Sequence, residues 1–159
     1  MYILRIHDNI KVKCAIVQID KNSVPKKKDG WMFNWLKAYR KSPNSIFMLV
    51  EEESRKQHGL IQLIQDDGML VMNLIELAPF NYGSNKAHKN VAGCLIAFGC
   101  KESLKLNTAY KGYLTFISKT ELIALYKTKY YATQTIGARM YIDPISGELL
   151  INEYLNYDE

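Results

Sequence analysis

The stretch HKNVAGCLIAFGCKE, residues 88–102, passes from charged residues to small residues and then to an apolar run. We predict a helix from residue 91 to about 106, whose first backbone N–H groups have no partners inside the helix. Such donors, together with the helix dipole, favour an anion, and Ala92 and Gly93 leave room for its approach. Three side chains just upstream would balance phosphate charge: Lys86, His88 and Lys89. The alternative is that Ala92 and Gly93 only pack against a sheet.

The elements that would position this helix follow from hydrophobic periodicity and turn residues. The predicted strands are 11–19, 45–53, 60–65, 69–77, 111–118 and 138–143. The predicted helices are 31–41, 91–106 and 118–131, with a helix or a strand at 146–156. Strand 69–77 is apolar on both faces apart from Asn73 and Glu76, which is typical of a central strand covered on both sides. A meander followed by alternating strands and helices predicts an α/β (α+β mixed) fold, with helices on both faces of a mixed sheet.

Two local motifs predict how these elements are joined. Asp66, Asp67 and Gly68 form a hairpin turn motif, with Gly68 at a left-handed position. Ser118 and Glu121 have the spacing of a capping box, in which each side chain satisfies a backbone donor at a helix start. The helix predicted at 118–131 should therefore begin at Ser118.

Length and composition favour one globular domain over residues 1–159. The chain is 48% hydrophobic, which excludes a disordered protein, and its net charge of +5 allows an anionic partner without identifying one. The chain has three cysteines, an odd number without zinc spacing, and we expect them to be small buried hydrophobic residues. His7, His58 and His88 are scattered along the sequence, so we predict no metal site. No segment has the pattern of a signal peptide or of a membrane span, so a cytoplasmic location is expected and a membrane partner is not.

Several short segments, in the same order along the chain, resemble the GNAT (Gcn5-related N-acetyltransferase) superfamily, and in particular a group of its small divergent members. The segments are Asn34–Trp35, GLI (59–61), IELAPFN (75–81), AGCLIAF (92–98) and SKTELIALY (118–126). The phosphate-binding motif of the family, Q/R-x-x-G-x-G/A, falls on His88, Lys89, Asn90, Val91, Ala92 and Gly93. Gly93 keeps the last position, whereas His88 replaces Gln or Arg and Val91 replaces the first glycine. A later family pattern falls on Leu125–Tyr126 and Ile136–Gly137.

The resemblance implies a central, mostly antiparallel sheet with a splayed cleft between two central strands. It implies an acyl-CoA-dependent N-acyltransferase, with acetyl-CoA or another acyl-CoA as donor and a primary amine as acceptor. Glu76 matches the position of the family's base, and Tyr126 matches the acid that protonates the departing thiolate. Backbone groups of Leu77, Ala78 and Phe80 would bind the pantetheine arm. For Glu76 a solvated carboxylate remains the alternative, and for Tyr126 a core aromatic residue does.

Other functions stay open at this point. The altered phosphate motif favours a catalytically inactive module that keeps the fold and binds CoA or another protein. Basic charge and many tyrosines allow nucleic-acid binding, but the sequence has no RRM or helix-turn-helix signature, so we do not expect this as the sole function. The acceptor is a small-molecule or peptide amine, or the amine of an aminoacyl-RNA, and a homodimer is compatible with the sequence. Trp31 and Trp35 either pack in the core or wall an acceptor pocket.

Overall fold

The computed structural model describes residues 1–156, which form a mixed α/β fold around one open, mostly antiparallel sheet of nine strands. The strand order is β6-β1-β2-β3-β4-β5-β7-β9-β8. The strands are β1 (Tyr2–Arg5), β2 (Ile10–Gln18), β3 (Ile46–Glu51), β4 (Gln57–Asp66), β5 (Met69–Leu77), β6 (His88–Lys89), β7 (Leu114–Ile117), β8 (Thr133–Gln134) and β9 (Arg139–Ile142). The α-helices are α1 (Trp35–Lys41), α2 (Val91–Ser103), α3 (Ile123–Lys129) and α4 (Pro144–Tyr154).

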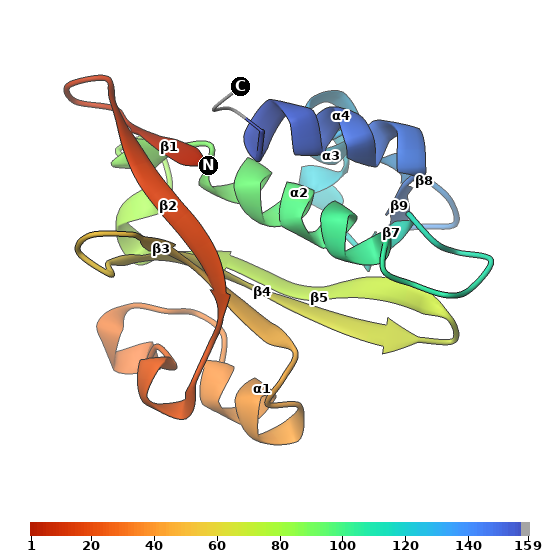
Figure 1. Cartoon of the computed structure of the whole chain (residues 1–159), viewed down its shortest axis with the longest axis horizontal. Coiled ribbons are helices and arrows are strands. Elements are labelled where there is room, and N and C mark those ends of the chain that lie inside the picture. Colours follow the sequence, from red (N-terminus) through yellow and green to blue (C-terminus); the bar gives the residue numbers. More distant parts are fainter. Residues whose placement is uncertain (157–159) are drawn as a thin grey trace.

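Helices cover both faces of the sheet, as the sequence predicts (Figure 1). Helix α1 and the segment before it lie against one face, whereas α2, α3 and α4 lie against the other. Each face has its own apolar core. Trp31 and Trp35 belong to the core on the α1 face, which confirms their prediction as core residues, and the buried residues of α2 fill the other core.

The predicted central strand is β5, which has the predicted bounds and an interior position in the sheet. The hairpin turn before it is also confirmed, because Asp67 and Gly68 both have positive φ angles, of 50° and 79°. This turn pairs β5 with β4 in an antiparallel ladder that runs nearly the length of both strands. The neighbour on the other side of β5 is β7, and this is a parallel pair.

The parallel ladder between β5 and β7 is short. It contains two residue pairs, Leu70 with Leu114 and Val71 with Thr115. Strand β5 continues to Leu77, so its last six residues have no ladder partner on the β7 side. The connection between the two strands contains α2, as expected for a parallel pair.

Several local predictions are wrong. Ser118 and Glu121 form no capping box: the Ser118 hydroxyl donates to the Lys119 carbonyl, and α3 begins only at Ile123, after a short 3₁₀ turn (Thr120–Leu122). Helix α1 begins at Trp35 rather than at residue 31, because the Asn34 side chain accepts from the Lys37 N–H and fixes the start. The C-terminal element at 146–156 is a helix, α4, which begins at Pro144 and is capped by Asp143.

Three strands were not predicted: β1, β6 and β8. β8 pairs with β9 at one edge of the sheet. β1 pairs with β2, and β6 (His88–Lys89) pairs with the other edge of β1. The residues immediately before α2 are therefore part of the sheet rather than a free loop. Among residues 1–156, no helix combines the length and the apolar character needed to cross a bilayer.

Candidate functional site

Glu76 lies near the end of β5, and its side chain faces the α1 side of the sheet. Its carboxylate accepts from the Met32 N–H at 2.6 Å, from the Phe33 N–H at 3.1 Å and from the Trp35 indole N–H at 2.8 Å. Both carboxylate oxygens are thus engaged, and the residue is only 2% exposed. Burial of a charge requires such partners. The contacts show that Glu76 anchors the segment leading into α1.

Tyr126 lies on α3 and packs against β7. Its ring centroid is 4.7 Å from that of Phe116, and the residue is buried. Burial raises the pKa of the Tyr126 hydroxyl, and the nearby Tyr82 raises it further. The hydroxyl therefore keeps its proton at neutral pH, which is the state that a proton donor needs.

Tyr82 is a site residue that the sequence analysis did not single out. It follows β5 by five residues and is largely exposed. Burial of part of the side chain raises the pKa of Tyr82, and Glu76 raises it further. Tyr82 is close enough to Glu76 and to Tyr126 to interact electrostatically with each of them. Within residues 1–156 the two predicted catalytic residues form no hydrogen bond with one another. In the sequence, the only signal for Tyr82 is its position in the connection that follows the central strand β5.

The start of α2 is partly closed by the protein itself. Asn90 is the N-cap residue, with a left-handed φ of 73° and no capping hydrogen bond from its side chain. A Cβ atom on Gly93 would lie 2.2 Å from the Tyr154 ring, so this glycine makes room for α4. Gly93 thus has a packing role, although its partner is a helix rather than the sheet. Lys89 and Asn90 are exposed, whereas Val91 is buried and Ala92 is half-buried.

The backbone after β5 also has partners within the protein. The Ala78 N–H donates to the His58 carbonyl at 2.9 Å, and the Phe80 carbonyl accepts from the Ala87 N–H at 2.8 Å. Leu77 pairs with Gly59 in the β4–β5 ladder. The Ala78 N–H and the Phe80 carbonyl, which the resemblance assigns to a pantetheine arm, therefore already have hydrogen-bond partners within the protein.

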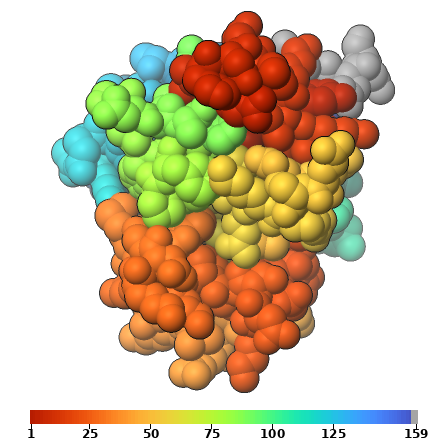
Figure 2. Space-filling view, turned by 90° about the vertical axis from the view of Figure 1, so that its left-hand side faces the viewer, coloured from red at the N-terminus to blue at the C-terminus, as the bar shows by residue number. Residues whose placement is uncertain are grey.

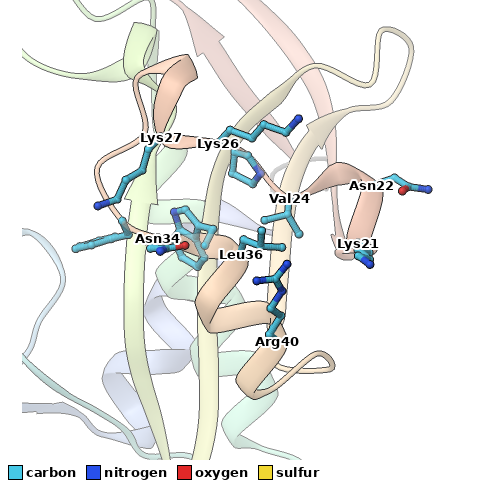
Figure 3. A pocket seen from close by; sticks show the side chains of 11 residues that line it. Lys21, Asn22, Val24, Lys26, Lys27, Asn34, Leu36 and Arg40 are labelled. Atoms are coloured by element: carbon cyan, nitrogen blue, oxygen red, sulfur yellow. The ribbon is translucent and has the colours of Figure 1, made fainter.

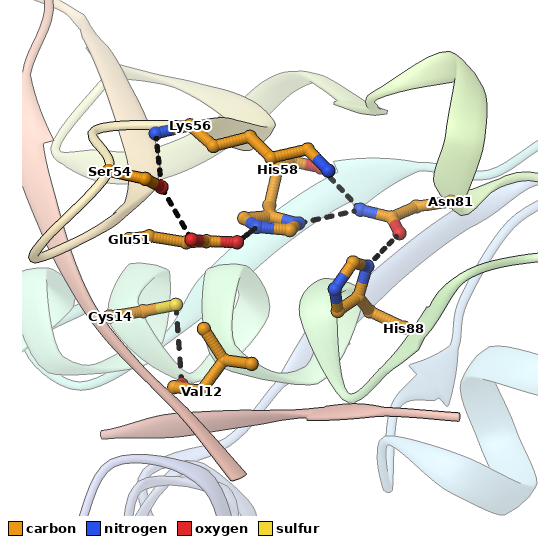
Figure 4. Close-up of polar contacts among 8 residues, drawn as sticks. All are labelled: Val12, Cys14, Glu51, Ser54, Lys56, His58, Asn81 and His88. Carbon is orange, nitrogen blue, oxygen red and sulfur yellow. Dashed lines mark hydrogen bonds and ion pairs between the residues drawn. The ribbon is translucent and has the colours of Figure 1, made fainter. Parts of the chain in front are cut away.

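A second polar cluster lies on the α2 side of the sheet (Figure 4). It consists of Glu51 at the end of β3, His58 in β4, Asn81 after β5 and His88 in β6, joined by hydrogen bonds of 2.8, 3.1 and 2.9 Å. His58 is fully buried and His88 is 5% exposed. The histidines that are scattered in the sequence therefore meet in the fold, through strand pairing that sequence spacing does not reveal.

Two cavities are lined by basic side chains. One, of about 480 Å³, lies beside α1 and the preceding loops (Figure 3), where Lys21, Lys26, Lys27 and Arg40 surround an apolar floor that includes Leu36. The other, of about 430 Å³, lies beside His88. Its lining residues are Arg5, Ile6, His7, Glu51, Lys56, Asn85, Lys86, Ala87 and His88.

Compared with models of known protein families, the chain matches none, and no curated protein sequence matches it.

Proposed function

We propose that the protein is an acyl-CoA-dependent N-acyltransferase of the GNAT type, with acetyl-CoA as the simplest donor and a primary amine as acceptor. The observation that carries the proposal is the short parallel ladder between β5 and β7. The loss of the ladder after two pairs supports the splayed arrangement of these two strands that the resemblance implies. Helix α2 connects these strands and places its N-terminus near the end of β5 where the ladder is lost.

In this proposal Tyr126 supplies the proton to the leaving thiolate. The acceptor nitrogen forms a bond to the thioester carbonyl carbon, and the carbon–sulfur bond breaks. The Tyr126 hydroxyl then donates its proton to sulfur, and the raised pKa of this hydroxyl keeps the proton available until that step.

Glu76 is the base of this proposal, and its contacts define what must change for it to act. An alkylammonium acceptor has a pKa of about 10 and must lose a proton before it attacks. Three N–H donors hold the Glu76 carboxylate in the absence of an acceptor. The segment of Met32 and Phe33 must release one oxygen, so acceptor binding and movement of this segment are coupled.

The fit of a CoA donor differs between its two ends. Tyr126 fits the thiol end, because its hydroxyl remains protonated. At the diphosphate end Lys89 and Asn90 are exposed, but Tyr154 occupies the space beside Gly93, and β6 is held by β1. These contacts favour the second candidate, a module that keeps the fold without the chemistry.

Calorimetric titration with acetyl-CoA, followed by thiol release with a panel of amines, separates the two candidates. The transferase is expected to bind acetyl-CoA and to release thiol with at least one amine. Tyr126→Phe should then lower kcat about 10²-fold, while Tyr110→Phe, an exposed tyrosine near the start of β7, should leave it unchanged. Binding without thiol release would support a CoA-binding module, and absence of binding would leave only an interaction module.

A further inference from the structure

In the cluster of Glu51, His58, Asn81 and His88, the hydrogen-bond partners determine which nitrogen of each histidine carries a proton. The first link is Glu51, whose carboxylate only accepts when ionised. Its Oε1 atom lies 2.8 Å from Nε2 of His58. The pKa of Glu51 lies below its ordinary value, because hydrogen bonds from Ser54 and His58 outweigh the opposing effect of burial. His58 Nε2 must therefore carry a proton and donate it to Glu51.

The next link is the amide of Asn81. Its Nδ2 atom lies 3.1 Å from His58 Nδ1 and 3.2 Å from the His58 backbone carbonyl oxygen. A carbonyl oxygen only accepts, so this contact fixes the amide with its NH₂ group toward His58. His58 Nδ1 is then an acceptor, which agrees with the proton on the Nε2 atom of a neutral ring.

The last link is His88. Asn81 Oδ1 lies 2.9 Å from His88 Nδ1, and because an amide oxygen only accepts, His88 carries its proton on Nδ1. Burial, together with the neighbouring His58 and Lys56, lowers the pKa of His88 to about 4, so the ring is neutral at pH 7. The chain of donors and acceptors therefore ends in one free lone pair, on His88 Nε2.

This lone pair is open to the cavity of about 430 Å³. His88 Nε2 makes no hydrogen bond to residues 1–156, and no buried side-chain nitrogen or oxygen in that part of the chain lacks a partner, so solvent must reach this atom. His88 lines the cavity. Figure 2 shows the face where the segments that form it meet: the first residues of the chain in red, residues near 55 in yellow and residues near 85 in green.

The charges around the cavity favour an anion. Lys56 and Lys86 line it, and neither forms an ion pair within residues 1–156. Lys56 instead lies 4.3 Å above the Phe80 ring, which places its ammonium group beside the histidines. Arg5 is already held by Asp8 at 2.7 Å, and Glu51 is engaged by His58. Two free cations therefore stand next to a hydrogen-bond acceptor.

We propose that this cavity binds a phosphate group that carries a proton, either inorganic phosphate or a phosphomonoester, with its charge on Lys56 and Lys86 and its P–OH donating to His88 Nε2. An oxyanion without a proton, such as sulfate, would place an oxygen lone pair against the nitrogen lone pair. The site thus selects an anion by its negative charge, through the lysines, and by its P–OH proton, through His88. This site uses Lys86 and His88, which the sequence analysis assigned to the phosphates of CoA, but the cavity opens between β1 and the β3–β4 turn rather than between β5 and β7. Binding of a phosphate here therefore does not require acyl transfer.

A metal ion is the competing occupant. Ligand atoms of Glu51, His58 and His88 lie within 4.8 Å of one another, which is close enough to surround a divalent cation. A cation would need a lone pair on His58 Nε2, but the contacts of Asn81 keep a proton there. Lys56 and Lys86 would also repel it. The tautomers thus favour the protonated oxyanion.

The test is calorimetric titration of the full chain with sodium phosphate and with sodium sulfate, at pH 7.5 and constant ionic strength. Phosphate is expected to bind roughly tenfold to a hundredfold more tightly than sulfate, since one lone-pair conflict costs about 1–3 kcal/mol. Lys56→Met with Lys86→Met should abolish binding of both anions. His88→Phe should remove the preference, while His7→Phe, at the rim, should keep it. Equal affinity for the two anions, or no binding of either, would overturn the proposal.

A second measurement does not depend on the variants folding. Long-range ¹H–¹⁵N spectra of the wild-type rings should show His58 protonated on Nε2 and His88 protonated on Nδ1, with the His88 Nε2 resonance moving on addition of phosphate but not of sulfate. A proton on His88 Nε2, or saturable binding of Zn²⁺ that shifts both rings, would contradict it. Methyl phosphate, compared with phosphate at pH 5.5, tells the two sources apart, because a monoester with a second pKa of about 6 still carries its proton there. Binding equal to that of phosphate indicates a monoester, and loss of binding confines the site to the inorganic ion.

Discussion

Glu76 and Glu51 are two carboxylates that lie near strand ends on opposite faces of one sheet, and their surroundings differ in one respect. Glu76 meets three N–H groups and nothing beyond them, so its network ends where it begins. Glu51 meets a histidine, whose second nitrogen meets an amide, whose oxygen meets another histidine. We call the Glu76 network closed, because all its groups pair with one another. The Glu51 network is open, because its last group, His88, lines a cavity. Whether a carboxylate near a strand end stabilises a loop or prepares a binding site depends on what the last group of its hydrogen-bond network contacts.

The closed network should show the largest effect on stability. Glu76→Ala leaves three donors without an acceptor, one of them the indole N–H of the fully buried Trp35. We therefore expect the free energy of unfolding to fall by about 3 kcal/mol or more. Urea unfolding measures this loss. Glu121→Ala, which removes an exposed carboxylate, is the control and should change stability by less than about 0.5 kcal/mol.

Glu76→Gln sharpens the same point. It keeps the shape but supplies one acceptor oxygen and two donor hydrogens, so it should lie between the wild type and Glu76→Ala in stability. A wild-type midpoint for Glu76→Gln would mean that the carboxylate is not needed for anchoring, and the contrast between the two networks would then disappear.

In the open network, replacing the donor group of Asn81 by an acceptor should change the pKa of His58. Asn81→Asp replaces the NH₂ group by an oxygen, which accepts from His58 Nδ1 instead of donating to it. His58 would then face carboxylates on both nitrogens, and its pKa, now lowered by burial against the opposing effect of Glu51, should rise above the ordinary 6.5. NMR titration of the His58 ring measures this change.

The same variant should lose about 2 kcal/mol of stability, because the contact of Asn81 with the His58 carbonyl becomes a meeting of two acceptors. Asn107→Asp is a matched control, because Asn107 is exposed and its side chain forms no hydrogen bond within residues 1–156. If His58 titrates in the variant as it does in the wild type, the assignment of tautomers along the chain is wrong.

The sequence predicts the elements better than it predicts the contacts between them. β5, the start of α2 and the turn at Asp67–Gly68 follow from local periodicity and turn chemistry, which neighbouring residues determine. β6 was missed because its pairing joins residues more than 80 positions apart, such as Leu4 and Lys89. β1 pairs with the adjacent β2, but its four residues are too few to show a periodic pattern. A motif match also says nothing about competing local contacts, which is why the capping box at Ser118 failed.

The sites follow the same rule. Glu76 was identified by its place at the end of the central strand, but its three partners come from residues 32 to 35, in a segment whose position depends on the α1-side core. His58 and His88 are 30 positions apart and have no metal spacing, so nothing in the sequence indicated that they meet. Sequence-based prediction therefore located Glu76 and His88 without the partners that the fold brings to them.

The last expected effect is a dependence of stability on pH to which the two histidines of the open network contribute. The pKa values of His58 and His88 are lowered in the folded protein, that of His88 to about 4, whereas both rings titrate near 6.5 when unfolded. Between pH 6.5 and about 4 the unfolded chain binds more protons, so stability must fall as the pH falls through this range. Urea midpoints measured at intervals from pH 7.5 to 4 should show this slope, and His88→Phe should reduce it while His7→Phe should not. An unchanged slope in His88→Phe would place the acid sensitivity elsewhere, and would remove the neutral, unprotonated nitrogen on which the contrast with Glu76 depends.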